Sequence, residues 1–217
     1  MSEPEERPPA IPRLGWAIAF IAASMLIAVA FNNLKNTRPY VVPGHLQKIS
    51  EVPAFKLTDQ TGRTVTLDDL KGKIWVANFI FTRCKGPCPL STLRMAELNK
   101  RLSKARKEVQ LISFTVDPDH DTPPVLAEYA KSSEADPAYW QFLTGPSADI
   151  NDIVVKGLLQ PLAKEPDGTP AHSTRFVIVD ANGWLRGYQD SADPEVLQKL
   201  MLDLGDLLRE SKSNNTK

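Results

Sequence analysis

The sequence predicts an α/β domain that follows one transmembrane helix. Three observations lead to this prediction: an apolar run near the N-terminus, two β-branched segments each followed by a helical pattern, and a hairpin followed by an amphipathic helix. The 217 residues suffice for one domain or two small ones. Basic and acidic residues number 26 each, which excludes the strongly basic surface of a typical nucleic-acid-binding protein.

The first element is the apolar run from Leu14 to Phe31, in which Ser24 has the only polar side chain. A helix of ~20 apolar residues crosses a bilayer, and Trp16 suits an interfacial anchor. The run could also be a cleaved signal peptide, because Ala28-Val29-Ala30 has the small-x-small form of a cleavage site. An internal core helix is disfavoured because the run has no polar face. We favour the anchor because the run is longer than the apolar region of a usual signal peptide.

The residues around this run predict a location for the protein but no orientation. Arg7 and Arg13 precede the run and Lys35 and Arg38 follow it, so the positive-inside rule does not decide the orientation. The acidic, proline-rich beginning MSEPEERPP is unlike a mitochondrial import signal. We therefore expect a single-pass protein of the bacterial inner membrane with its globular domain in the periplasm. The predicted order is a cytoplasmic N-terminus (1–13), the transmembrane anchor (14–31), a tether (32–50), the domain (51–210) and a polar tail (211–217).

The domain is predicted to begin with a hairpin and a strand–helix–strand unit. The hairpin comprises Ala54 to Thr58 and Thr64 to Leu67 around Asp59-Gln60-Thr61-Gly62. Two segments are apolar enough for strands covered on both faces, Ile74 to Thr82 and Val109 to Val116. The helix between them has Pro89 in its first turn and apolar residues at helical spacing, namely Met95, Leu98 and Leu102.

The rest of the domain is predicted as helix, elaboration, hairpin and helix. A second helix follows Thr122-Pro123-Pro124, and residues 135–171 form an elaboration. Arg175 to Val179 and Trp184 to Tyr188 flank an Asn-Gly turn, and the last helix begins at Asp193-Pro194. Two parallel buried strands joined by a helix, followed by a hairpin, make the layout of a thioredoxin-like fold. The added N-terminal hairpin precedes that layout.

Cys84 and Cys88 are the only cysteines, and they lie where the chain leaves a buried strand and enters a helix. Helix N-termini stabilise thiolates, so this placement predicts a reactive pair. A structural disulfide is disfavoured because so short a loop gains little stability from closure. Buried, inert thiols are disfavoured by the polar Arg83-Cys84-Lys85-Gly86 segment. Disulfide exchange and soft-metal binding both remain open from the pair alone.

The three histidines differ in their expected surroundings. His45 lies in the tether and His120 lies in an Asp-rich loop, where both are most simply exposed. His172 precedes a hairpin strand, and in a thioredoxin-like topology that loop packs beside the turn with the cysteines. Two thiolates and one imidazole suit Cu(I) and leave Zn²⁺ one ligand short. Asp117-Pro118 is either a simple turn or a group that orients a ligand.

Several stretches of the domain resemble the Sco/SenC family of copper chaperones. They occur in the family's order across Val52 to Leu208, after one membrane anchor, and read FIFTRCKGPCP, TVDPDHDTP, WQFLTG and AHSTRFVIVDANG. The resemblance implies that Cys84, Cys88 and His172 bind copper and that Asp117 lies beside the site. It also implies a role in assembling the CuA centre of cytochrome c oxidase subunit II. Lys85-Gly86-Pro87 departs from the apolar or acidic residues expected between the cysteines.

Other functions could use the same pair of cysteines. A membrane-tethered thiol-disulfide oxidoreductase would need Cys84 and Cys88 as its redox-active pair but not His172. A peroxidase is disfavoured because neither cysteine has a PxxxTxxC pattern around it. The sequence does not predict the oxidation state of the copper, the copper donor or the oligomeric state.

Overall fold

The computed structural model describes residues 23–28, 46–84, 88–105 and 107–214. The chain divides into two compact units, residues 1–42 and 43–217. In the first unit residues 23–28 are helical. The rest of the predicted span from Leu14 to Phe31 lies outside the described residues. Within the described ranges no helix has the length and apolar character needed to cross a membrane.

The second unit contains an eight-stranded mixed sheet in the order β1-β10-β9-β4-β5-β6-β2-β3. Its strands are β1 Ser50–Glu51, β2 Lys56–Asp59, β3 Thr64–Thr66, β4 Ile74–Ile80, β5 Val109–Thr115, β6 Trp140–Thr144, β9 Arg175–Val179 and β10 Trp184–Asp190. A second sheet pairs β7 Leu162–Lys164 with β8 Pro170–His172. The helices are α2 Leu67–Leu70, α3 Cys88–Arg101, α4 Pro123–Ser132, α5 Ser147–Asn151, η1 Asp152–Gly157 and α6 Val196–Asn214.

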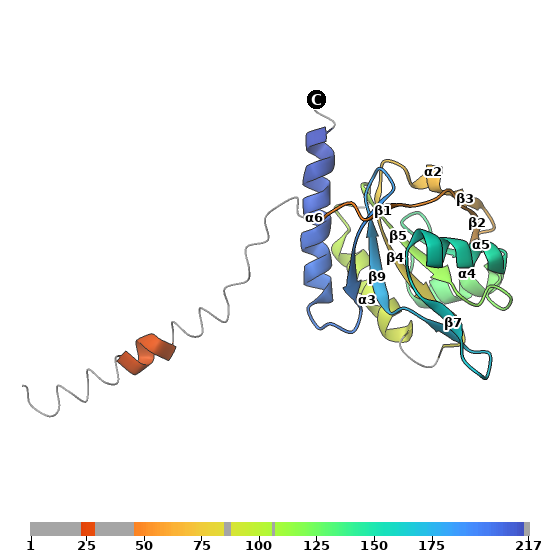
Figure 1. Ribbon diagram of the computed structural model, residues 1–217, viewed down its shortest axis with the longest axis horizontal. Coiled ribbons are helices and arrows are strands. Elements are labelled where there is room, and N and C mark those ends of the chain that lie inside the picture. The colour runs from red at the N-terminus through yellow and green to blue at the C-terminus, as the bar shows by residue number, and fades with distance from the viewer. Residues whose placement is uncertain (1–22, 29–45, 85–87, 106, 215–217) are drawn as a thin grey trace, which may run out of the picture. The chain divides into compact units, whose positions relative to one another are not determined.

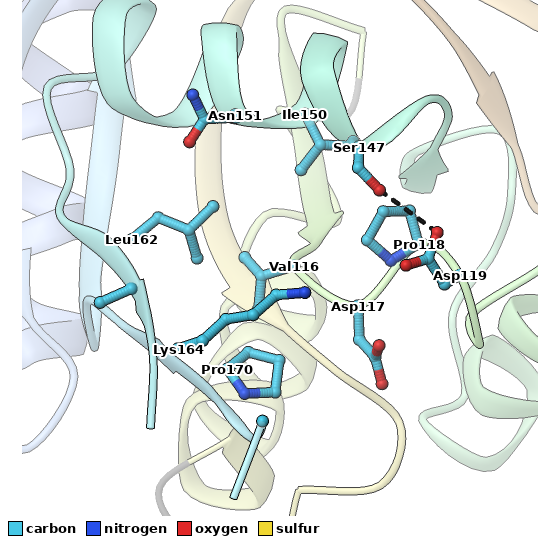
Figure 2. Close-up of a pocket in the computed structure, with 12 residues that line it drawn as sticks. Val116, Asp117, Pro118, Asp119, Ser147, Ile150, Asn151, Leu162, Lys164 and Pro170 are labelled. Carbon is cyan, nitrogen blue, oxygen red and sulfur yellow. Dashed lines mark hydrogen bonds between the residues drawn. The ribbon is translucent and has the colours of Figure 1, made fainter. Parts of the chain in front are cut away.

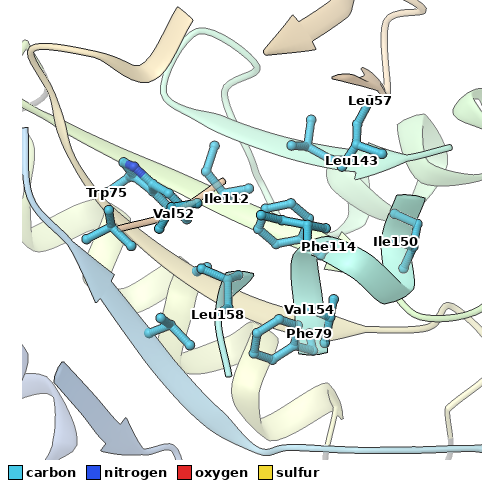
Figure 3. Close-up of a cluster of buried hydrophobic side chains, with 14 of the residues drawn as sticks. Val52, Leu57, Trp75, Phe79, Ile112, Phe114, Leu143, Ile150, Val154 and Leu158 are labelled. Carbon is cyan, nitrogen blue, oxygen red and sulfur yellow. The ribbon is translucent and has the colours of Figure 1, made fainter. Parts of the chain in front are cut away.

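The central strands separate two apolar cores. β4 and β5 run parallel in register, and every residue of both strands is buried. Because side chains alternate along a strand, Trp75 and Phe79 of β4 face one core whereas Ile74 and Ile80 face the other. The first core packs against α5 and η1 (Figure 3), and the second packs against α3, α4 and α6. In Figure 1, α6 and α5 accordingly lie on opposite sides of the strands.

The predicted hairpins and the parallel unit are present. β2 pairs antiparallel with β3, and β9 pairs antiparallel with β10. Gly62 and Gly183 occupy their turns with φ of +85° and +82°, a region that favours glycine. A bulge in β10 lies at Arg186, which is buried and ion-paired with Asp180 and Glu210.

Some predicted boundaries differ from the structure. The elaboration at residues 135–171 includes β6, which pairs parallel with β5 and joins the main sheet. Residues 46–50 were predicted as tether, yet the Ile49 amide bonds to Leu185 and the Leu46 carbonyl bonds to Arg186. The last helix begins at Val196, after Asp193, and continues to Asn214 into the predicted polar tail.

A buried chain of polar side chains fixes the first turn of α3 to the sheet. The Trp140 indole N–H donates to Ser113 Oγ, and the Ser113 hydroxyl donates to Asn78 Oδ1 at 2.6 Å. The Asn78 amide then donates to Ser91 Oγ at 3.0 Å. Ser91 lies three residues after Cys88, so this network holds the start of the cysteine-bearing helix in place.

Candidate metal centre

The two cysteines lie on either side of the predicted strand-to-helix turn. Cys88 is the first residue of α3 and Cys84 follows β4, while residues 85–87 lie outside the described part of the chain. Both are free thiols. Cys88 is only 1% exposed and belongs to the first core, whereas Cys84 is half-buried and packs against that core. The two sulfurs therefore differ in access to solvent.

His172 reaches Cys88 from the β7–β8 hairpin. Its Nε2 lies 3.1 Å from Cys88 Sγ, and its Nδ1 lies 2.8 Å from the carbonyl oxygen of Ser173. A carbonyl oxygen can only accept, so Nδ1 carries the hydrogen and the Nε2 lone pair faces the sulfur. The Phe81 ring packs edge-on against the imidazole, with ring centroids 5.8 Å apart. The imidazole is thus oriented as a metal ligand would be.

Burial controls the protonation of this pair. It raises the pKa of Cys88 to about 12, with a smaller contribution from a hydrogen bond with Cys84. Burial also lowers the pKa of His172, although the bond to Ser173 opposes this effect. Burial of Cys88 therefore opposes the thiolate that the helix N-terminus is expected to favour. At neutral pH the site holds a Cys88 thiol beside a neutral imidazole.

Of the three predicted ligands, the structure brings Cys88 and His172 into contact, whereas the ligand atoms of Cys84, Cys88 and His172 do not all lie within 4.8 Å of one another. Cys84 packs against the core that contains Cys88 and is near enough to raise the pKa of the Cys88 thiol. The three residues offer two sulfurs and one unprotonated nitrogen. Such a donor set fits Cu(I), which prefers soft thiolate ligands.

Asp117 lies against Arg83, the residue before Cys84. Its Oδ2 accepts from Arg83 Nη2 at 2.6 Å, and the guanidinium is 60% exposed while the carboxylate is 15% exposed. On the other side, Asp117 lines a pocket of about 220 Å³ that also contains Lys164 and Pro170 (Figure 2). Pro170 lies in β8 together with His172, so Asp117 is placed between the Cys84 turn and the strand that carries His172.

His120 is exposed, as expected, but its imidazole lies close to the carboxylates of Asp117 and Asp121. Among the described residues, one set of three ligand-type side chains has all its ligand atoms within 4.8 Å of one another, and that set is Asp117, His120 and Asp121. Asp121 is fully buried and already accepts three hydrogen bonds from Thr82 and Thr115. Asp117 is paired with Arg83. These carboxylates are therefore occupied by protein donors. His45 lies outside the described residues.

A groove of about 450 Å³ opens beside Cys84. Cys84 lines it together with Thr82, Pro89 and Leu93. Tyr129 lines it as well, and burial raises the pKa of its hydroxyl, which bonds with Thr92 at 2.9 Å. Cys84 is therefore the sulfur that an approaching molecule can reach.

Sequence reasoning missed four groups that shape this site, namely Phe81, Arg83, Asp121 and the Ser173 carbonyl. Arg83 precedes Cys84 and Ser173 follows His172, while Phe81 lies three residues before Cys84. Their closeness to the predicted ligands in the sequence could have indicated them. Asp121 gave none, because an aspartate in a polar loop looks like an exposed turn residue.

Comparison with known proteins decides the family. The family model described as SCO1/SenC matches residues 44–201. The chain belongs to the SCO1/SenC family. It is 37% identical over 136 residues to the SCO1 protein homolog of Bacillus subtilis, an alignment covering 61% of this chain and 70% of the relative. It is 33% identical over 153 residues to the SCO2-like protein of Rickettsia felis, covering 67% and 73%.

Solved structures of SCO1/SenC proteins share the fold. A SCO1/SenC family lipoprotein from Bacillus anthracis superposes with a TM-score of 0.69 at 32% identity, covering 73% of this chain and 95% of that one. BsSco, described as a member of a family of cytochrome c oxidase assembly proteins and as having a disulfide switch, gives 0.65 at 31% identity, covering 74% and 98%. Copper-bound ScoI of Bradyrhizobium japonicum gives 0.62 at 27% identity, covering 73% and 99%. The mixed α/β fold is therefore the thioredoxin-like fold of this family.

Proposed function

We propose that this SCO1/SenC protein is a membrane-anchored copper chaperone. It holds copper through Cys84, Cys88 and His172 and assists assembly of the CuA centre of cytochrome c oxidase subunit II. The observation that carries the proposal is the 3.1 Å contact between Cys88 Sγ and a His172 Nε2 whose lone pair faces the sulfur. The copper-bound relative and the family's link to oxidase assembly support it.

Each ligand has a distinct role in this proposal. Bound copper would supply a soft cation that two sulfurs and an imidazole can share and release. Cys88 loses its proton when it becomes a ligand, because a coordinating thiol is deprotonated. His172 is already neutral and oriented, so it joins the site without losing a proton. Cys84 borders the groove, so it is the ligand that a partner's cysteine can replace first.

A second function uses the same sulfurs. Cys84 and Cys88 are both free thiols, and Cys84 is near enough to raise the pKa of Cys88, so the two reduced thiols lie close together, as a thiol-disulfide oxidoreductase requires. The disulfide switch described for BsSco favours this reading as well. In that function the accessible Cys84 attacks a partner disulfide, and Cys88 resolves the mixed disulfide to leave a Cys84–Cys88 disulfide and a reduced partner.

His172→Ala separates the two functions. The purified chain, loaded with Cu(I), is mixed with a reduced, metal-free CuA domain of oxidase subunit II, and copper transfer is followed by measuring the copper in each protein after the two are separated by ion exchange. In parallel, the metal-free dithiol is mixed with the oxidised CuA domain, and its reduction is followed by thiol labelling. If the protein is a copper chaperone that uses His172, the His172→Ala variant should lose copper transfer. If transfer persists at the wild-type rate without His172, the proposed ligand set is wrong.

The location is part of the proposal. We propose a single anchor at residues 14–31 in a bacterial inner membrane, with the domain in the periplasm. A reporter enzyme active only in the periplasm, fused after residue 217, should be active and should stay with the membrane fraction. Activity in the soluble fraction would indicate cleavage of the apolar segment, and an inactive fusion would place the domain on the cytoplasmic side.

A further inference from the structure

The position of Cys84 depends on one short turn. β4 ends at Ile80, and the Cys84 amide donates to the Phe81 carbonyl at 3.1 Å. This bond closes a four-residue turn in which Thr82 and Arg83 are the two middle residues. Whatever holds these two residues therefore also fixes the place where Cys84 leaves the sheet.

Both middle residues are attached to the loop that follows β5. Asp121 accepts from the Thr82 amide at 3.1 Å and from the Thr82 hydroxyl at 2.6 Å. Asp117 accepts from Arg83. Asp121 is fully buried, whereas the Arg83 guanidinium is 60% exposed. Hydrogen bonds to a buried carboxylate contribute more than an exposed ion pair, so Asp121 is the main attachment.

Asp121 is itself held firmly on the side of β5. The Thr115 hydroxyl donates to its Oδ2 at 2.6 Å, and His120 Nδ1 lies 3.0 Å from its Oδ1. Its own amide donates to the Asp117 carbonyl at 2.9 Å. The carboxylate thus bridges the ends of the parallel strands β4 and β5. It binds Thr82, which lies in the Cys84 turn after β4, and Thr115, which is the last residue of β5.

We propose that Asp121 is a positioning residue that sets where the Cys84 sulfur lies by clamping the Phe81–Cys84 turn to the loop after β5. Cys84 is the accessible sulfur of the pair, so this clamp governs how readily Cys84 reacts with another sulfur. For copper the inference rests on the proposed function, because a displaced Cys84 would complete the three-ligand site less well. For the reactivity of the metal-free thiol it stands independently of that function.

The two threonines provide a matched test. Thr82→Val and Thr115→Val each remove one hydroxyl that donates to Asp121 at 2.6 Å, but only Thr82 belongs to the Cys84 turn. Asp121→Asn keeps the shape and removes the charge. The full chain of each variant is reduced and freed of metal, and alkylation of Cys84 and Cys88 is timed by peptide mass spectrometry. Cu(I) affinity and the midpoint potential of the pair are measured on separate, unalkylated samples of the same variants.

We expect Thr82→Val and Asp121→Asn to change the Cys84 alkylation rate and the midpoint potential, and Thr115→Val, which loosens Asp121 only on the side of β5, to change both by less. Copper affinity should fall about 10- to 100-fold in the first two variants, as for other groups that orient metal ligands. Equal effects in both threonine variants, or an unchanged Cys84 in Asp121→Asn, would overturn the clamp. If the wild-type chain binds no copper, the proposed function fails, while the Cys84 rates still decide the clamp. If Asp121→Asn does not fold, the threonine pair decides alone.

Discussion

Cys88 should react much more slowly with thiol reagents in the folded, metal-free protein than in the unfolded chain. Cys88 is 1% exposed, and burial is the main cause that raises its pKa from 9.0 to about 12. At pH 7.5 the thiolate fraction is therefore smaller by about 1,000-fold in the folded chain than in the unfolded chain. A more basic thiolate is also a better nucleophile, with a Brønsted coefficient of about 0.45, which restores about 20-fold. The net expectation is a reaction about 40-fold slower, before steric hindrance adds to it.

The assay uses the Cys84→Ser variant, in which Cys88 is the only thiol. Reaction with 4,4′-dithiodipyridine is followed by absorbance in buffer and in urea that unfolds the chain. The matched control is Cys88→Ser, which leaves the half-buried Cys84 and should react faster in buffer than the first variant. The reasoning is refuted if Cys88 reacts as fast in the folded chain as in urea.

Three further predictions concern pH and stability. Because Cys88 is protonated at neutral pH and must lose its proton to bind copper, this thiol alone should make the apparent Cu(I) affinity fall about tenfold for each unit that the pH drops between 8 and 6, and the second thiolate ligand steepens the fall, as measured by competition with a Cu(I) chelator; an affinity independent of pH would contradict this. Arg186→Ala should lower the free energy of unfolding by about 3–5 kcal/mol in urea titrations, because it leaves the Asp180 carboxylate buried without its cation, whereas the exposed Lys156→Ala should cost less than about 1 kcal/mol. Asn78→Ala should cost about 2–4 kcal/mol by the same method, because it leaves two buried hydroxyls without their partner, and a cost below 1 kcal/mol would contradict the role of the network.

Much of the fold was predictable because its signals are local. The mostly β-branched and aromatic sequences of β4 and β5 predict strands covered on both faces, and the turn glycines Gly62 and Gly183 predict the hairpins. β6 was missed because its pairing with β5 joins residues distant in sequence, and its run of five residues is short. The same reason explains why residues 46–50 were taken as tether, since their hydrogen-bond partners lie in β10.

The sequence predicts that His172 lies beside the cysteines but does not predict how burial affects the protonation of Cys88. Cys84, Cys88 and His172 follow from residue type, spacing and topology, and the 3.1 Å contact of Cys88 with His172 agrees with that expectation. The raised pKa of Cys88 depends on how deeply packing buries one sulfur, which spacing does not reveal. The clamp at Asp121 likewise depends on contacts between residues 82 and 121 that only the folded chain brings together.

Copper binding by single-ligand variants tests the central claim most directly. The purified chain and its Cys84→Ser, Cys88→Ser and His172→Ala variants are each titrated with Cu(I) against a chelator of known affinity, and bound copper per chain is measured after gel filtration. The proposed site predicts one copper per wild-type chain, loss of stable binding in both cysteine variants and weakened binding in His172→Ala. Wild-type stoichiometry and affinity in all three variants would contradict it.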